Sequence, residues 1–517
     1  MIAQDVRYGF RQLYRSPGFA AAVVLTLALG IGANTAIFSV VEAVLLRPLP
    51  YRDASRLVKI VAGSPGVGLK DVATSPVELQ DLRGLDGVFD DVSVAWPVSV
   101  NLTGAKEPAR LELLGVSPNY FSMLGVAPQI GRIFGSQDVA EGFAEAVVIS
   151  DGLWRRSYGA DPAVLGKRVR LDNDIYTIVG VLPRGFRHPG RTVAGDVDVW
   201  ATAGFTANPF PKPARNARFL PGLIGRLTPS IGLEQARARL ADLSARLRQD
   251  FPNDYPTQGR FTLDIQLLQE SLVGDIRPML LVLMAAVTLI ILVASVNIAN
   301  LLLARASGRQ REIAVRLALG ATPRRIVSQL VTEAMLLSLV AGGVGLSAAG
   351  AGMALVIRLL PPQVAHLADA SIDLQVVAFA LGISLLTGAA FGLAPAIQSA
   401  RGDLVRGIRE GSWGSGHGAR TNRMRAALIV TELALAVVLM VGAGLLVRTF
   451  WSLAKEYPGF NPSGVVTAGV WLPVPNDPNA DLYAAPEVRN RFVRESLRRV
   501  GALPGIEEAA ITSALPA

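Results

Sequence analysis

Five apolar segments, each long enough to cross a lipid bilayer, constrain the fold of this 517-residue chain more than any other feature. A membrane-spanning helix needs about 20 mostly apolar residues, because the hydrocarbon core is about 30 Å thick and each helical residue rises about 1.5 Å. Hydrophobic residues make up 51% of the chain and charged residues only 18%, which indicates a membrane protein. The predicted spans are residues 19–46, 279–304, 331–357, 374–397 and 426–450.

Clusters of arginine orient these spans. They lie in residues 1–18, before span one, in residues 305–330, between spans two and three, and in residues 398–425, between spans four and five. If the chain crosses at every span, all three clusters lie on one side, and the positive-inside rule makes that side cytoplasmic. We therefore expect a cytoplasmic N-terminus, an exported domain at 47–277 and a second exported segment from 451–517.

Ordinary enzyme and metal-site patterns do not occur in this sequence. The chain has no cysteine, and its three histidines (His188, His366 and His417) are scattered, so we expect no metal site. Residues 159–168 are glycine-rich, but Arg168 stands where a phosphate loop needs Ser or Thr, so a turn is predicted. The net charge of +9 comes mostly from arginines beside apolar runs, which does not indicate nucleic-acid binding. We expect no catalytic residues and no cofactor.

Spans three and four are rich in glycine and alanine, which favours close packing against other helices rather than against lipid. Ionisable or amide side chains inside a membrane are costly unless they face a partner, water or the interface. We interpret most of those found here as lying at helix ends, with a buried partner as the alternative. They are Glu42, Asn297, Asn300, Glu333 and Glu432.

The exported domain has an α+β pattern. Two β-α-β units flank an insertion at residues 101–218, which predicts a split βαβ lobe with an inserted, mostly β lobe. In the insertion, 146–149 and 176–182 have the β-branched content of strands, and Asp172-Asn173 predicts a turn. The flanking units consist of predicted strands at 57–61, 88–100, 219–227 and 261–267 and predicted helices at 76–83 and 233–247.

A short amphipathic helix is predicted between spans two and three. Arg309, Glu312 and Arg316 share one face of it, and Gly320 can end it. Such a helix can lie on anionic lipid headgroups, or it can dock on a cytoplasmic partner.

Residues 311–321, REIAVRLALGA, resemble the R-E-I-x-x-R-x-x-x-G-A segment of FtsX-like permeases, the family that includes MacB and the lipoprotein-releasing transporters. The exported domain is similar to the MacB periplasmic core at 116–126 (VSPNYFSMLGV) and 180–186 (GVLPRGF). Residues 28–38 (ALGIGANTAIF) look like the duplicated permeases abundant in acidobacteria.

This resemblance implies a permease of the bacterial inner membrane that works with a separate cytoplasmic ABC ATPase. ATP hydrolysis would then be transmitted to the exported domain through the inner-surface helix. The resemblance assigns the coupling role to Arg311, Glu312, Arg316 and Gly320. An alternative function is a non-transporting signalling or scaffold protein that regulates cell-envelope enzymes.

An internal repeat is also predicted. Residues 423–425 lead into span five and then into residues 457–462, much as Arg11 leads into span one and an exported strand. We therefore expect one complete four-span unit followed by the start of a second unit. A second permease unit or a homodimeric partner, together with membrane lipids, is expected to surround the spans.

Overall fold

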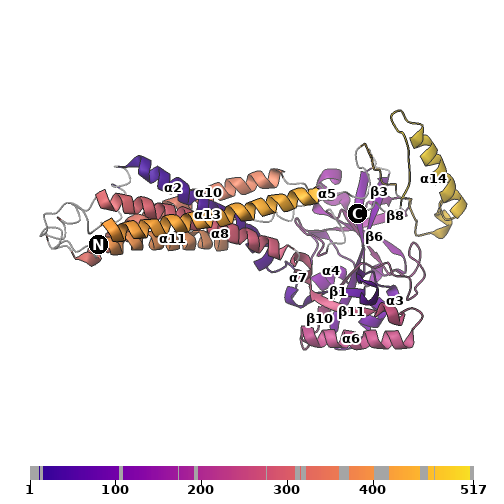
Figure 1. Cartoon of the computed structure of the whole chain (residues 1–517). Coiled ribbons are helices and arrows are strands. Elements are labelled where there is room, and N and C mark those ends of the chain that lie inside the picture. Colours follow the sequence, from indigo (N-terminus) through magenta and orange to yellow (C-terminus); the bar gives the residue numbers. More distant parts are fainter. Residues whose placement is uncertain are drawn as a thin grey trace. The chain divides into compact units, whose positions relative to one another are not determined.

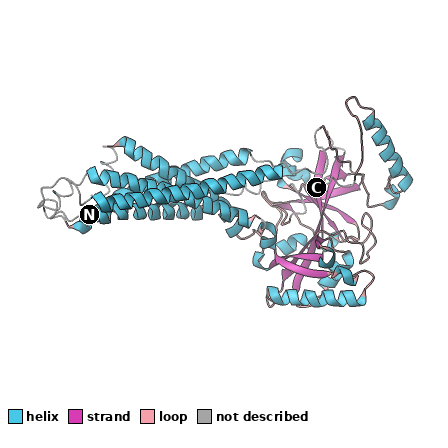
Figure 2. Ribbon diagram, in the orientation of Figure 1, coloured by secondary structure: helices cyan, strands magenta, loops and turns pink. Residues whose placement is uncertain are grey.

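The computed structural model describes residues 11, 16–103, 109–172, 174–190, 196–274, 276–308, 315, 319, 322–359, 372–400, 418–454, 464–470 and 472–512. The chain divides into two compact units. One unit, a helical bundle, comprises Met1–Arg47 and Asp275–Glu456, and the other, an α/β domain, comprises Pro48–Gly274 and Tyr457–Ala517. Figures 1 and 2 show the helices of the bundle and the strands of the α/β domain.

One mixed sheet organises the described part of the α/β domain. Its strands follow the order β11-β1-β10-β3-β4-β9-β6-β8-β5, while β2 pairs with β1, and β7 pairs with β3 and β8. The strands are β1 (Leu57–Ser64), β2 (Leu69–Val72), β3 (Phe89–Thr103), β4 (Ala109–Val116), β5 (Ile130–Gly131), β6 (Phe143–Ile149), β7 (Arg168–Leu171), β8 (Asp174–Val181), β9 (Val199–Ala203), β10 (Gly222–Leu227) and β11 (Thr262–Leu267).

Two helices pack on one face of the antiparallel strands β11, β1, β10 and β3. Helix α3 (Pro76–Arg83) begins after Ser75, as predicted, because Ser75 and Glu78 form a capping box. The Glu78 N–H donates to Ser75 Oγ at 3.2 Å, and the Ser75 N–H donates to Glu78 Oε2 at 2.9 Å. Helix α6 (Leu233–Asp250) confirms the predicted amphipathic helix, since it buries the apolar stripe Ala236, Leu240, Leu243 and Leu247.

The side chains on the two faces of the sheet belong to two different hydrophobic clusters. Side chains alternate along a strand, so Val58 and Ile60 of β1 point toward α3 and α6. Leu57 points to the opposite face, where it packs with Ile224 of β10 and Leu268. That face is covered by α4 (Tyr120–Leu124) and by α7 (Leu268–Val273).

In the chain, strands β4 to β9 and helix α5 (Asp151–Tyr158) come after β3 and before β10. Val147, Ile149 and Ile178 lie in their common core. Strands β7 and β8 form a hairpin in which Leu171 pairs with Asp174. Asp172 has a φ of 52°, a left-handed conformation that Asp tolerates in tight turns, so the predicted turn is confirmed at this residue.

One predicted strand boundary is wrong. The strand expected at 219–227 begins only at Gly222, as β10, and Leu220 instead forms an isolated bridge with Thr74. Pro221 separates the two pairings. Proline has no N–H to donate, and its ring fixes φ, so a continuous ladder cannot run through this position.

Figure 1 shows the bundle helices running alongside one another. In the described residues, four stretches are long and apolar enough to cross a membrane: Pro17–Leu46, Arg277–Leu302, Arg324–Ala354 and Ala426–Thr449. The predicted fourth span falls on α11, whose described apolar stretch, Leu374–Ala390, is shorter than a span. The helices are α2 (Pro17–Val41) with its π-helical end η1 (Glu42–Leu46), α8 (Arg277–Gly308), α10 (Pro323–Leu359), α11 (Leu374–Ala400) and α13 (Gly418–Ala454).

The segment that follows α13 contacts the α/β domain through Asn476. Asn476 Oδ1 accepts from the Phe143 N–H, and Asn476 Nδ2 donates to the Phe143 carbonyl oxygen, both at 3.2 Å. The backbone N–H of Asn476 donates to Asp174 Oδ2 at 2.9 Å. Asn208 donates to the Pro475 carbonyl oxygen at 2.6 Å. Helix α14 (Pro486–Gly501) follows, and none of its residues is buried.

Candidate functional site

The four residues predicted to couple to an ATPase lie outside the described residues: Arg311, Glu312, Arg316 and Gly320. Two of their neighbours are described. The N–H of Leu319 donates to the carbonyl oxygen of Val315 at 3.0 Å, which is the hydrogen bond of one helical turn. Both side chains are exposed, Val315 by 54% and Leu319 by 83%. Two apolar side chains in the predicted coupling segment are therefore exposed.

Glycines bring α2 and α10 into very close contact. A Cβ atom added to Gly345 would lie 2.8 Å from the Ala28 carbonyl oxygen, and one added to Gly32 would lie 2.9 Å from the Gly345 carbonyl oxygen. Helix α11 approaches α10 in the same way, since a Cβ at Gly388 would lie 3.0 Å from the Met335 Cα. The prediction that the small residues of spans three and four pack against protein is confirmed at Gly345 and Gly388, whereas Gly343, Gly352 and Gly382 have open space around them.

Buried polar side chains also link α2 to α8 and α10 to α11. Asn34 of α2 is 1% exposed, and its Nδ2 donates to the Val287 carbonyl oxygen of α8 at 2.7 Å. Ser338 of α10 contacts α11, where its Oγ donates to the Ser384 carbonyl oxygen at 2.5 Å and lies 2.9 Å from Thr387 Oγ1. Hydrogen bonds between spans contribute to helix association in the membrane, because few other polar partners are available there.

An ion cluster joins the end of the first span to the start of α11. Arg47 Nη2 lies 2.9 Å from Glu42 Oε2 and 2.8 Å from Asp373 Oδ2. The Glu42 side chain is only 3% exposed, whereas that of Arg47 is 38% exposed. Asp373 also caps α11, since its Oδ1 accepts from the Val376 N–H at 3.0 Å. One guanidinium thus holds together two segments that are 326 residues apart in the chain.

Local hydrogen bonds stabilise the charged forms of Asp373 and Arg47. The hydrogen bond from the Val376 N–H lowers the pKa of Asp373 most, and the Arg47 guanidinium lowers it further. Burial raises this pKa, but the net shift is downward. The hydrogen bond to Glu42 raises the pKa of Arg47. Farther into the bundle, Phe38 and Phe379 stack with ring centroids 4.0 Å apart, which extends the contact between α2 and α11.

The polar residues noted within the predicted spans have different environments. Glu42 lies at a helix end, as predicted, and also has a buried partner in Arg47. Glu333 lies within α10 and accepts a 3.4 Å hydrogen bond from Gln329. Asn297, which is exposed, and Asn300, which is half-buried, lie within α8, and the half-buried Glu432 lies within α13. The prediction that most of these residues lie at helix ends is therefore wrong. Sequence reasoning did not single out Arg47 or Asp373. An aspartate directly before the apolar run of α11 was the available signal for the second of them.

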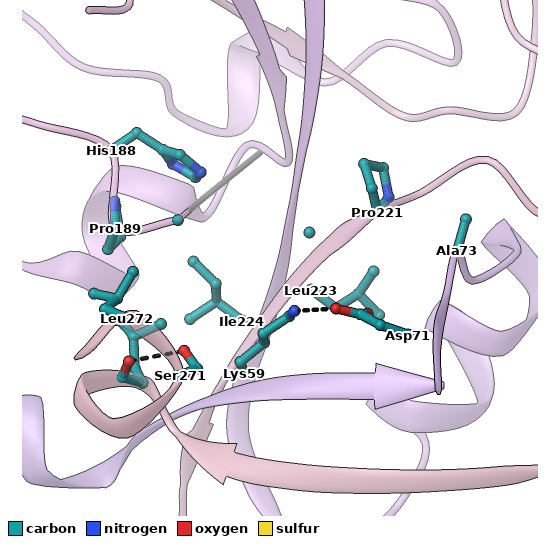
Figure 3. A pocket seen from close by; sticks show the side chains of 13 residues that line it. Lys59, Asp71, Ala73, His188, Pro189, Pro221, Leu223, Ile224, Ser271 and Leu272 are labelled. Carbon is teal, nitrogen blue, oxygen red and sulfur yellow. Dashed lines mark hydrogen bonds and ion pairs between the residues drawn. The ribbon is translucent and has the colours of Figure 1, made fainter. Parts of the chain in front are cut away.

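The α/β domain contains a cavity of about 270 Å³ on the face of the sheet opposite α3 and α6. Figure 3 shows Lys59 of β1, Ile224 of β10, Leu272 of α7 and His188 around this space. Tyr120 Oη lies 2.6 Å from His188 Nδ1. Burial lowers the pKa of His188 to about 3, so the imidazole is neutral at physiological pH.

Metal and phosphate chemistry finds no support in the described residues. No group of three or more His, Asp or Glu side chains there is placed to hold a metal ion. The glycine-rich stretch forms the αL cap of α5 at Gly159, a short 3₁₀ helix at Pro162–Val164 and the start of β7, so the predicted turn is confirmed.

The bundle and the α/β domain together define a polytopic membrane protein with a large domain inserted after its first span. Residues 20–243 match the family model of the MacB-like periplasmic core domain, and residues 284–403 match that of the FtsX-like permease C-terminal domain. The chain belongs to the FtsX-like, MacB-like ABC transporter permeases.

Curated relatives bear the name macrolide export ATP-binding/permease protein MacB. MacB 1 of Aeromonas hydrophila is 25% identical over 391 residues, which cover 75% of this chain and 56% of the relative. MacB of Vibrio parahaemolyticus is 24% identical over 396 residues, which cover 75% of this chain and 55% of the relative. The chain thus spans about half the length of the curated relatives it matches.

Solved structures of similar domains include the periplasmic region of MacB from Actinobacillus actinomycetemcomitans. It has a TM-score of 0.32 and 14% identity, and the match covers 43% of this chain and 94% of that one. The extracellular domain of the transporter YknZ from Gram-positive bacteria has a TM-score of 0.30 and 15% identity, with 41% of this chain and 99% of that chain covered.

Proposed function

We propose that this chain is the membrane-spanning subunit of an ABC-type exporter or mechanotransmission complex, and that ATP is hydrolysed by a separate cytoplasmic ATPase. The observation that carries this proposal is the tight packing of α2 against α10 at Gly32 and Gly345, in a chain with both family domains. Helices packed backbone to backbone move together. A force applied to the segment before α10 would therefore reach α2.

The force would reach the α/β domain along the chain itself. Helix α2 continues through η1 to Arg47, and the α/β domain begins at the next residue, Pro48. The ion cluster of Glu42, Arg47 and Asp373 attaches this exit point to α11. A displacement of α10 and α11 would thus act on the first residues of the α/β domain through a short and charged connection.

The proposed topology has five spans, with α11 as the fourth, a cytoplasmic N-terminus and an extracytoplasmic α/β domain in the inner membrane. Its support is the arginine distribution, together with the length of α11, which is 27 residues. We further interpret β11-β1-β10-β3 with α3 and α6 as a split βαβ lobe and β4 to β9 as the inserted lobe, since the chain returns to the first group only at β10.

Helix α13 is proposed to face lipid and a second permease unit or a second copy of the chain. No residue in its apolar window is buried, whereas 44% of the window in the first span is buried. An apolar helix with so little protein around it needs an apolar environment on its remaining faces.

The coupling role of Arg311, Glu312 and Arg316 is tested by binding to candidate ABC ATPases. The detergent-solubilised chain is used in pull-down assays, and wild type is compared with Glu312→Arg and Arg316→Glu. Arg324→Glu is the matched control for Arg316→Glu, because Arg324 is an exposed arginine near the start of α10 and the two substitutions change the charge by the same amount.

The proposal predicts that Glu312→Arg and Arg316→Glu lose ATPase binding, while Arg324→Glu keeps it. Equal loss in all three variants would show a general effect of charge and would contradict specific docking. If wild type binds no ATPase while its α-helical circular dichroism signal is preserved, the signalling or scaffold function is favoured instead.

A further inference from the structure

The cavity in the α/β domain has the composition of a small-ligand site. Its volume of about 270 Å³ would hold roughly nine water-sized groups, at about 30 Å³ for each water, which is close to the lower limit for ligand pockets. Most of the wall is apolar and comes from three separate elements. Ile224 belongs to β10, Leu268 and Leu272 belong to α7, and Pro189 lies in the loop after β8.

Two side chains of opposite charge, Lys59 and Asp71, also line this cavity. Lys59 lies directly across from Ile224 in the β1–β10 ladder, so its side chain projects from the cavity face of the sheet. The ammonium donates to Asp71 Oδ2 at 2.5 Å. Lysine has three N–H donors, and the bond to Asp71 uses one of them. A ligand anion can therefore bind Lys59 without displacing Asp71.

The exposures of the two charges favour an anionic ligand over a cationic one. The Lys59 side chain is 29% exposed, while that of Asp71 is 55% exposed. Water continues to solvate Asp71 when the cavity is filled, whereas Lys59 loses part of its hydration and gains from a new counter-charge. His188 adds no opposing charge, because its half-buried imidazole is neutral.

The backbone at Asp71 is held in an unusual conformation. Its φ is 135°, a region that residues other than glycine rarely adopt. The pairing of β1 with β2 also shifts its register between Ala62 and Ser64, opposite this segment. Strained backbone persists where surrounding contacts require it, and it is concentrated at ligand sites. Here the backbone conformation of Asp71 brings its carboxylate into an ion pair with the Lys59 ammonium at the cavity rim (Figure 3).

We propose that this cavity binds a small amphipathic carboxylate with an apolar body, whose carboxylate is held by Lys59 and whose body contacts Ile224, Leu268 and Leu272. The size of the cavity corresponds to a ligand of roughly ten non-hydrogen atoms. A ligand of that size is expected to bind with a dissociation constant of about 0.1–1 mM.

The test uses 4-fluorophenylacetate as the probe and the full chain in lipid nanodiscs. Binding is followed by broadening of the ¹⁹F NMR signal, after subtraction of the broadening caused by empty nanodiscs. The matched cation 4-fluorophenethylamine has a similar body and the opposite charge. Three variants are compared with wild type: Lys59→Met, Lys59→Arg and Ser271→Phe, the last of which fills the cavity from α7. Lys70→Met is the control, because Lys70 is exposed and does not line the cavity.

Lys59→Met is expected to weaken binding of the carboxylate about tenfold, because it removes a charged hydrogen bond at a partly exposed site. Ser271→Phe should abolish binding, while Lys59→Arg and Lys70→Met should remain within about threefold of wild type. Thermal unfolding of each variant shows whether the domain has remained folded. Wild-type broadening no greater than that of empty nanodiscs, tighter binding of the amine, or a folded Lys59→Met variant with unchanged affinity would overturn the proposal.

Discussion

Replacement of Arg47 by methionine is expected to destabilise the bundle by leaving a buried carboxylate without its cation. Glu42 is 3% exposed, and Arg47 is bound to it through both Nε and Nη2, at 3.3 and 2.9 Å. Methionine keeps an apolar stem of similar length, so the substitution removes mainly the charge and its hydrogen bonds. The contact with Asp373 is lost at the same time.

The expected cost follows from the burial of the two groups. Removal of one partner from a fully buried ion pair costs about 3–5 kcal/mol. Arg47 is 38% exposed, so water can replace part of its interaction with Glu42, and we expect a loss of about 1–3 kcal/mol. For a bundle of this size, that corresponds to a fall in Tm of about 2–10 °C.

The assay is thermal unfolding of the chain in nanodiscs, monitored by circular dichroism at the helical band. The double variant Glu42→Gln/Arg47→Met removes both charges, so it should recover at least half of the loss caused by Arg47→Met alone. Arg110→Met is the control at an exposed position on β4 and should change stability by less than about 0.5 kcal/mol. If the double variant is no more stable than Arg47→Met, the buried charge on Glu42 is not the cause and the reasoning is refuted.

Two further predictions concern the same bundle. The pKa of Asp373 is lowered first by the Val376 N–H and then by the Arg47 guanidinium, so these contacts stabilise the chain above the unfolded pKa of about 3.9, and their contribution is lost as pH falls through the lower folded value. Asp373→Asn keeps the helix cap but not the charge, so the difference in Tm from wild type should be present at pH 6 and should shrink as pH falls below the unfolded pKa. A difference that is independent of pH would contradict this role. Gly345→Ala should lower Tm, because the new methyl group would lie 2.8 Å from the Ala28 carbonyl oxygen. Gly343→Ala should raise Tm through the higher helix propensity of alanine, because a methyl group there would have nothing within 4 Å. Equal shifts in Tm for the two variants would refute the close approach of α2 and α10.

Local sequence signals predicted many of the elements of this protein. Helix α3 begins after Ser75 and α6 follows its apolar stripe, since caps and periodicity act within a few residues. The strand β10 shows the limit of such signals, because Pro221 interrupts the mostly apolar run of residues 219–227. The five apolar segments likewise indicated a membrane protein, because span length depends only on the thickness of the bilayer.

The contacts that make up the candidate sites were decided by tertiary structure. Arg47 and Asp373 are 326 residues apart, and each has an ordinary local context in the sequence. His188 meets Tyr120 across 68 residues, and Lys59 meets Asp71 only because β2 folds back on β1. Sequence patterns report which face of an element is buried. Which buried faces meet depends on the packing of the whole chain, and a local pattern does not contain that information.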